Sequence, residues 1–177
     1  MNLRHQWECS MNYIFLDIDG VMNNQEDWLN KAKNNLEEFE DHRMFCDKAW
    51  ELLSDVCSTT NARVVLSSSW RLGFKNHNGY IVCKSDTDPL SQRLLSYFKK
   101  YNIELVGLTT NHYDYRGKQI HDYVKRHLFA TDKWVVLDDE NCDITGYCTE
   151  EQMIKTEWLT GLLPEHCERI VKYFKGE

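Results

Sequence analysis

The sequence predicts an α/β fold built on a doubly wound parallel sheet flanked by helices. Short, continuous apolar runs alternate with segments of helical pattern from residue 12 onward. Such runs are typical of strands that are buried on both faces, and their alternation with helices favours a parallel sheet. The runs at 13–16 and 134–137 each end in aspartate, and ligand sites of parallel sheets lie at the carboxyl ends of the strands.

The predicted elements alternate along the chain. Each strand is a run rich in valine, isoleucine, leucine and aromatic residues. The helix starts carry their own signals: Asp47 is acidic, Asp88 and Pro89 combine an N-cap with a first-turn proline, and Pro164 begins the last helix. The strands are expected over 13–18, 63–67, 103–108, 134–138 and, more weakly, 152–156, and the helices over 47–58, 89–100, 117–128 and 164–174.

Two connections between the predicted strands and helices are longer than ordinary loops, and both leave from the carboxyl end of a strand. They cover residues 22–46 and 72–87, and we expect them to form a small lid over the site of a single domain spanning 11–177. Residues 1–10 are expected to be a short N-terminal extension. The aromatic residues of the lid either pack within it or contact the substrate; they are Trp28, Phe39, Phe45 and Tyr80.

Composition limits the class of protein. With 177 residues, 42% of them hydrophobic and 28% charged, the chain fits one domain with a full core. No apolar run approaches the length of a membrane span and the first ten residues are polar, so a cytoplasmic protein without membrane segments is expected. The seven cysteines include no Cys-x-x-Cys pair, which favours reduced thiols. A net charge of −7 argues against extensive nucleic-acid binding.

Two acidic pairs are the candidate functional residues. Asp17 and Asp19 close the first predicted strand, and Asp138 and Asp139 close the strand at 134–138. Four carboxylates gathered at one rim of a sheet would raise one another's pKa unless a cation compensated their charge. A set of oxygen ligands with room for water and a substrate phosphate suits Mg²⁺. The pattern therefore predicts a magnesium-dependent phosphoryl-transfer site.

These residues belong to a larger ordered set of motifs. The set comprises Asp17-Ile18-Asp19-Gly20-Val21, Val64-Val65-Leu66-Ser67, Lys118 at the start of a helix, and Asp138-Asp139-Glu140-Asn141-Cys142-Asp143. With this set, the chain resembles the haloacid dehalogenase (HAD) superfamily of aspartate-nucleophile phosphatases and their Rossmann-like fold. The segments Leu66-Ser67-Ser68-Ser69-Trp70-Arg71 and Arg116-Gly117-Lys118 are similar to the branch found in Swiss-army-knife RNA-repair proteins and, more distantly, to polynucleotide phosphatase domains.

The resemblance implies a role for each carboxylate. Asp17 would attack phosphorus and form an aspartyl-phosphate, and Asp19 would protonate the leaving group and then activate water. Residues two apart on a strand face the same way, so both carboxylates can reach one phosphoryl group. Mg²⁺ would be held by Asp17, the Asp19 backbone carbonyl and Asp139. Asp138 and Asp143 would orient this cluster or bind the metal through water.

Contacts to the phosphate are implied for five further residues. Ser67 would donate its hydroxyl to a phosphate oxygen. Lys118 would add a positive charge at a helix N-terminus, where the helix dipole also favours anions. Ser68, Arg71 and Arg116 are further candidates for substrate binding, and a solvated surface position is the alternative for both arginines.

The resemblance favours a phosphomonoester hydrolase with an open site, whose substrate is a nucleotide or the terminal phosphate of a nucleic acid. A small sugar phosphate is one alternative, and an inactive HAD-like binding module is another. Trp70, Tyr113 and Tyr115 lie near the predicted catalytic edge and either stack on a base or pack locally. An acid two residues after the nucleophile, as at Asp19, favours phosphate chemistry over dehalogenation.

One competing motif points to a different chemistry. The segment from Cys57 to Arg63 has the Cys-x5-Arg spacing of cysteine-nucleophile phosphatases. In that class the loop must cradle phosphate between a strand and a helix, with the cysteine ionised. Here the order is reversed, because Cys57 ends a predicted helix and Arg63 starts a predicted strand. We therefore expect no cysteine-based catalysis.

Overall fold

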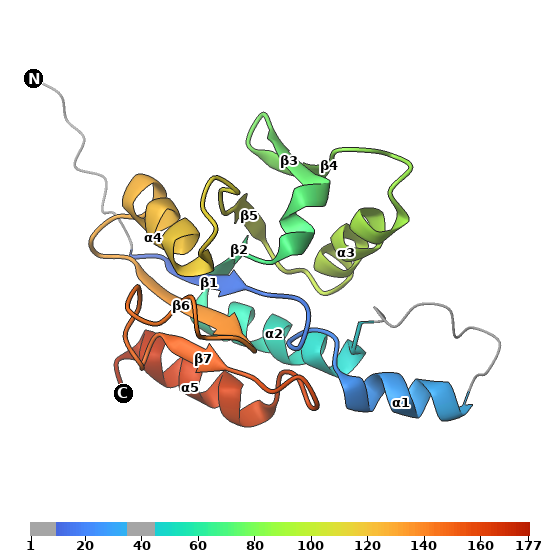
Figure 1. The fold of residues 1–177 in the computed structure, drawn as a ribbon. Coiled ribbons are helices and arrows are strands. Elements are labelled where there is room, and N and C mark those ends of the chain that lie inside the picture. The colour runs from blue at the N-terminus through green and yellow to red at the C-terminus, as the bar shows by residue number, and fades with distance from the viewer. Residues whose placement is uncertain (1–9, 35–44) are drawn as a thin grey trace, which may run out of the picture.

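The centre of the molecule is a five-stranded parallel sheet, which confirms the predicted fold class (Figure 1). The computed structural model describes residues 10–34 and 45–177. Leu16 pairs with Leu66 on one side and with Leu137 on the other, so the three central strands end at the same level. From edge to edge the strands are β5 (Leu105–Leu108), β2 (Ala62–Leu66), β1 (Asn12–Leu16), β6 (Lys133–Asp138) and β7 (Met153–Lys155).

Alternating side chains along the strands build two cores, one on each face of the sheet. Ile14 and Leu16 belong to the larger core, whereas Phe15 between them belongs to the smaller one. Helices cover both faces, which is the doubly wound arrangement that the sequence predicts (Figure 1). The larger core is covered by α2 (Asp47–Thr60), α3 (Pro89–Lys100) and α5 (Pro164–Lys175), and the smaller core by α4 (Arg116–His127).

The boundaries of these strands and helices agree with the predicted ones to within two residues. The local signals act as expected at the ends of the helices. Asp88 caps α3 by accepting hydrogen bonds from the backbone N–H groups of Leu90 (3.2 Å) and Ser91 (3.3 Å). The left-handed conformation of Asn61 ends α2 directly before β2.

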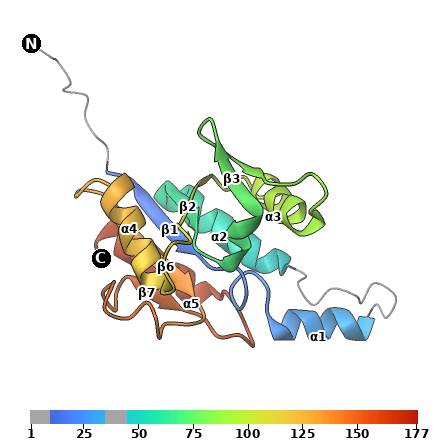
Figure 2. The same ribbon diagram turned by 45° about the horizontal axis from the view of Figure 1, so that its top comes forward.

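The first long connection contains a helix that the sequence did not predict. This helix, α1 (Gln25–Asn34), extends away from the sheet and lies outside its two helical layers (Figures 1 and 2). Its start is fastened to a distant loop, because the N–H groups of Gln25 and Glu26 donate to the carbonyls of Trp158 (3.1 Å) and Leu159 (3.0 Å). The rest of the predicted lid, at 35–44, lies outside the described residues.

The second long connection forms an antiparallel hairpin, where no strand was predicted. A short 3-10 helix, η1 (Ser69–Gly73), leads from β2 into β3 (Phe74–His77) and β4 (Tyr80–Cys83). Asn78 and Gly79 both have positive φ angles, +52° and +85°, as the two-residue turn of a hairpin requires. The hairpin stands at the β5 edge of the sheet beside α3 (Figure 2).

The aromatic residues assigned to the lid occupy different environments. Phe45 is buried, with ring contacts to Trp50 and Tyr97 at 5.7 and 4.8 Å between centroids, so it packs in the larger core. Tyr80 is 74% exposed, and Trp28 is half-buried on α1. Phe39 lies outside the described residues.

Two general expectations concern the described part of the chain. Every cysteine described there is a free thiol, as the absence of Cys-x-x-Cys pairs indicated. No helix in residues 10–34 and 45–177 has both the length and the apolar character that crossing a bilayer requires.

Candidate active site

Three aspartates meet at the carboxyl rim of the sheet. Asp17 directly follows β1, Asp138 ends β6, and Asp139 comes next; one oxygen from each lies within 4.8 Å of the others. The backbone N–H of Asp17 donates to the carbonyl of Leu137 (2.9 Å), which ties the first acidic pair to the second. Asp17 is 4% exposed and Asp138 is fully buried. The structure thus brings together acids that lie more than a hundred residues apart in the sequence.

The turn after β1 makes room for this cluster. Gly20 has a φ of +73°, and a Cβ atom there would lie 2.3 Å from Oδ2 of Asp139. The turn is held from two sides, since the N–H of Gly20 donates to Asn23 Oδ1 (3.0 Å) and its carbonyl accepts from Thr156 Oγ1 (2.8 Å). Glycine is therefore required at position 20 both for its conformation and for the space that Asp139 occupies.

The cluster is electrostatically strained without a cation. Burial and the neighbouring charge of Asp138 raise the pKa of Asp17 to about 7. Burial raises the pKa of Asp138 to about 6, against the opposing charge of Arg116. Burial and the adjacent Glu140 also raise the pKa of Asp139. Desolvated carboxylates that repel one another are the environment that a divalent cation relieves.

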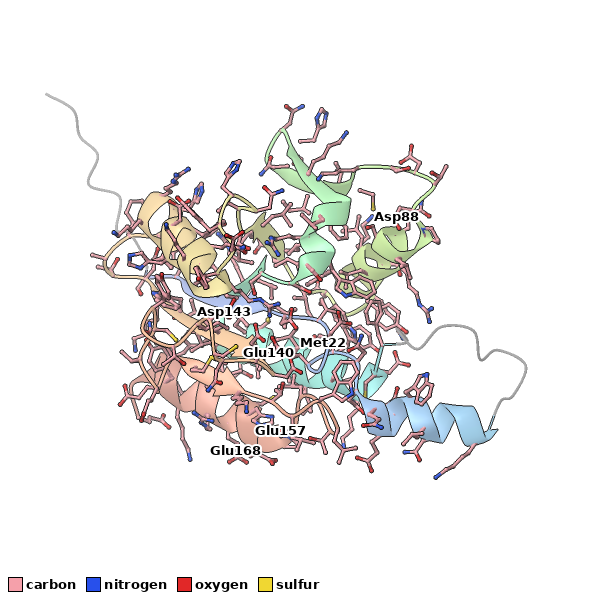
Figure 3. The ribbon with its side chains drawn as sticks, viewed as in Figure 1. Met22, Asp88, Glu140, Asp143, Glu157 and Glu168 are labelled. Carbon is pink, nitrogen blue, oxygen red and sulfur yellow. The ribbon has the colours of Figure 1, made fainter. Side chains whose placement is uncertain are left out.

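The residues at the rim fit Mg²⁺. Asp17, Asp138 and Asp139 would hold it, because the three converging side chains offer only hard oxygen ligands and leave positions for water and phosphate. The side chains of Asp19 and Asp143 lie outside this group of three, and metal binding by the Asp19 backbone carbonyl stays a prediction. Glu140 and Asp143 mark the loop that follows β6 beside the cluster (Figure 3).

Asp19 is held by two hydrogen-bond donors. Trp70 Nε1 donates to its Oδ2 (2.9 Å), and Asn23 Nδ2 donates to its Oδ1 (2.8 Å). Trp70 comes from η1 and Asn23 from the turn after β1, so two elements orient one carboxylate. For Trp70 the sequence leaves base stacking and local packing open; its indole N–H positions Asp19 and its ring packs against Phe45 at 5.5 Å between centroids, while stacking on a base stays a prediction. The role of Asn23 was missed, although an amide four residues after Asp19 is a signal that a tight turn offers.

Arg116 is the cation that faces the cluster. Its Nη1 lies 3.2 Å from Oδ1 of Asp17 and also pairs with Oδ2 of Asp138. Although burial disfavours the charged guanidinium, Asp17 and Asp138 keep its pKa above the ordinary value. Arg116 therefore offers a permanent positive charge to a phosphate that approaches Asp17.

Lys118 and Asp143 are placed differently from the roles that the resemblance implies. Lys118 is exposed, and its Nζ lies over the ring of Tyr113 at 4.4 Å from the centroid. Asp143 Oδ2 accepts a hydrogen bond from the backbone N–H of Arg116 (2.8 Å) and so holds the start of α4. Catalysis by Lys118 and metal binding by Asp143 stay predictions, while the geometry gives Arg116 the position beside Asp17.

Hydroxyl groups line the ends of β2 and β5 next to the aspartates. Ser68 forms a side-chain hydrogen bond with Asp17 that favours the ionised carboxylate. Ser67 is fully buried and Thr109 is 5% exposed, yet in the described part of the chain neither hydroxyl has a hydrogen-bond partner. Thr109 lies beside Ser67 because its N–H donates to the carbonyl of Leu66 (3.1 Å). Unsatisfied buried donors of this kind are available to a ligand oxygen.

Arg71 braces the loops around the site. Its guanidinium donates to the carbonyls of Ser67 (3.1 Å) and Ser68 (2.8 Å) and to Gln119 Oε1 (2.7 Å). Burial and the nearby charge of Arg116 lower its pKa, which Asp17 partly offsets. These bonds use both terminal nitrogens of Arg71 and order the strand end that carries the serines. Its buried Nε has no partner among the described residues, and substrate binding by Arg71 stays a prediction. Gln119 has no local signal of function in the sequence, whereas Gly107-Leu108-Thr109 is one of the segments similar to the RNA-repair branch.

The cysteine motif does not form a phosphate loop. Cys57 lies inside α2, where burial raises the pKa of its thiol to about 12. Arg63 lies in β2 and pairs with Glu104 through Nε at 3.0 Å. A buried, protonated thiol cannot serve as the nucleophile of a phosphatase.

Fold and site together define a Rossmann-like α/β domain with an aspartate cluster at the carboxyl rim of its parallel sheet. A family model described as the HAD domain in Swiss Army Knife RNA repair proteins matches residues 13–167. The chain therefore belongs to this family of HAD domains, which are typically phosphatases or related hydrolases that use Mg²⁺. Comparisons with curated proteins and with solved structures found no match.

Proposed function

We propose that the protein is a Mg²⁺-dependent phosphatase that hydrolyses a phosphomonoester through an aspartyl-phosphate on Asp17. One observation carries this proposal: a buried aspartate faces two further carboxylates and an arginine, and a second acid held by two donors follows two residues later. A nucleophile, a proton carrier and a phosphate-binding charge are thus present at one rim.

The side chains account for both halves of the reaction. An oxygen of Asp17 bonds to phosphorus as the bond to the leaving oxygen breaks, and Asp19 gives that oxygen its proton. Asp19 then takes a proton from the water that attacks phosphorus, and Asp17 leaves as a free carboxylate. Bound Mg²⁺ would neutralise the charge of the transferred phosphoryl group and of the carboxylates.

The neighbours of these two acids orient the reacting groups. Trp70 and Asn23 fix the Asp19 carboxylate, so its proton is delivered in one direction. Arg116 and the free hydroxyl of Ser67 are the donors for the non-bridging phosphate oxygens. The hydrogen bond from Ser68 favours the ionised, nucleophilic form of Asp17 and opposes the effect of burial on its pKa.

The proposed substrate is a nucleotide or the terminal phosphate of a nucleic acid. The family to which the chain belongs is described as a domain of RNA repair proteins, which supports a substrate of the nucleic-acid class. The net charge of −7 fits recognition of one terminus rather than of a long backbone. A small sugar phosphate is the alternative within the same chemistry.

Phosphate release with a panel of substrates tests the proposal. The panel contains nucleoside monophosphates, 3′- and 5′-phosphorylated oligonucleotides, sugar phosphates and phosphopeptides. We expect hydrolysis with Mg²⁺, loss of hydrolysis on chelation, and loss of at least about 1,000-fold in kcat for Asp17→Asn, because no nucleophile remains. Cys57→Ser serves as the control and should retain activity. Absence of release from every class with Mg²⁺ present would favour a binding module instead.

A further inference from the structure

A small cavity lies beside the proposed catalytic acid. It has a volume of about 200 Å³ and is lined by Asn23, Asn24, Gln25, Trp28 and Trp158. Asn23 is also the residue that donates to Asp19, at 2.8 Å, so the cavity and the catalytic rim share a wall. Trp158 is 51% exposed, so about half of its side chain is open to solvent at the cavity.

The cavity is built by two segments that are bonded together. The first turn of α1 donates its N–H groups to the carbonyls of Trp158 and Leu159, and the loop after β7 thereby carries Trp158 next to α1. Figure 3 labels Glu157 on this loop. Gly161 closes the loop against the turn after β1, where a Cβ atom would lie 2.8 Å from the carbonyl of Val21. The two tryptophans are therefore held beside the active site by backbone contacts.

The lining selects a neutral, flat group that forms hydrogen bonds. Two indoles and three side-chain amides line the cavity, and no charged side chain is among the described residues of that lining. Among the described residues of the lining, none offers a counter-charge to a phosphate. The cavity is smaller than the 300 to 1,000 Å³ or so of pockets that enclose drug-sized ligands, so it suits a single ring system. Aromatic faces together with amide groups are what proteins use to stack and hydrogen-bond a nucleobase.

We propose that this cavity binds the nucleobase of the residue that carries the scissile phosphate. The inference rests on the proposed function and deepens it: Arg116 holds the phosphate at Asp17, and the base of the same nucleotide stacks in the cavity lined by Trp158 and Trp28. Asn23 couples the two, because it contacts Asp19 and also lines the cavity. A mononucleotide and an oligonucleotide end offer the same base and phosphate.

Substrates with and without a base test this inference. Adenosine 5′-monophosphate is compared with ribose 5-phosphate, and a phosphorylated oligonucleotide is compared with one whose terminal residue is abasic. We compare kcat/KM for the base-bearing substrate with kcat/KM for its base-free counterpart. Trp158→Ala should lower this ratio by about 5- to 100-fold, mainly through KM, because the loss of one stacking contact has about this effect. Trp158→Phe should restore most of the ratio. If only the adenosine pair shows the effect, the substrate is a mononucleotide; if only the oligonucleotide pair shows it, the substrate is an oligonucleotide end.

A matched control and a binding measurement complete the test. Phe129→Ala removes another exposed aromatic residue, 62% exposed and before β6 at the opposite end of the strands, and should leave the ratio unchanged. Equal losses on base-bearing and abasic substrates, or a selective loss on a phosphopeptide, would overturn the inference. Calorimetric binding of adenosine 5′-monophosphate to the Asp17→Asn protein needs no turnover. If adding Trp158→Ala to the Asp17→Asn protein leaves this affinity unchanged, the base site is refuted. If the unsubstituted protein releases no phosphate from any substrate, the proposed phosphatase activity is refuted instead.

Discussion

At the scale of single residues, the rotation of α4 decides which cation faces the aspartates. Residues two positions apart on a helix point to different sides, so Arg116 and Lys118 do not both face the rim. Asp143 accepts from the N–H of Arg116, and a Cβ atom at Gly117 would lie 2.6 Å from the carbonyl of Asp143. These contacts set the orientation of the first turn and direct Arg116 inward. The sequence shows both cations but not this rotation.

Replacement of the two cations should therefore have unequal effects. Arg116→Met should lower kcat/KM for phosphate release by about 10- to 100-fold, because a charge-assisted hydrogen bond worth about 1.5 to 3 kcal/mol is lost. Lys118→Met should lower it by less than about 3-fold, since the lysine lies over Tyr113. Arg116→Lys keeps the positive charge but loses the planar guanidinium, so it separates the contribution of charge from that of geometry. A larger loss for Lys118→Met than for Arg116→Met would restore the role that the resemblance implies for Lys118.

At the scale of elements, the two long connections contain structure that the sequence reading missed for different reasons. The Asn78-Gly79 turn of the hairpin is a strong local signal, so β3 and β4 were predictable. The polar helix α1 has no such signal, because its start is satisfied by carbonyls from Trp158 and Leu159 far along the chain. Whether these two insertions act as a lid stays a prediction.

Gly20, in the turn after β1, and Gly79, in the turn of the β3–β4 hairpin, offer a matched pair of substitutions. Gly79→Ala places a methyl group at a positive φ of +85° in open space, so it should cost stability alone, about 1 kcal/mol. Gly20→Ala adds a clash with Asp139 at a similar φ, so it should also displace that ligand. We expect a rise of at least about 10-fold in the Mg²⁺ concentration for half-maximal activity, for Gly20→Ala only. Unchanged Mg²⁺ dependence in both variants would show that Asp139 does not hold the metal.

At the scale of the whole molecule, folding gathers acids that repel one another. Burial raises the pKa of Asp17 to about 7 and that of Asp138 to about 6, so between about pH 4 and 7 the metal-free folded protein binds more protons than the unfolded chain. Its stability should therefore fall as pH rises through this window, by up to about 1.4 kcal/mol per pH unit for each proton released. Chemical denaturation at pH 5 to 8, with chelator and then with Mg²⁺, measures this slope.

Two comparisons isolate the contribution of the cluster to that slope. Mg²⁺ should flatten the profile, because it compensates the ionised carboxylates. Asp17→Asn should flatten it without metal and should stabilise the protein at pH 8 by at least about 1 kcal/mol. Burial lowers the pKa of His166, so this histidine makes stability rise with pH. The unsubstituted protein and Asp17→Asn share this effect, so it cancels in their comparison. Parallel profiles for the two metal-free proteins would contradict the burial of a charged Asp17.

The sequence by itself determined the strands, the helices and the position of the acidic pairs at strand ends. Continuous apolar runs and helix-start residues are local properties of the sequence, so the α/β class and the meeting of Asp17 with Asp139 at one rim followed from them. Only the tertiary structure decided that Arg116 faces the cluster, that Trp70 and Asn23 hold Asp19, and that Trp158 comes to lie beside α1. These contacts depend on helix rotation and on loops from distant parts of the chain, which no local pattern encodes.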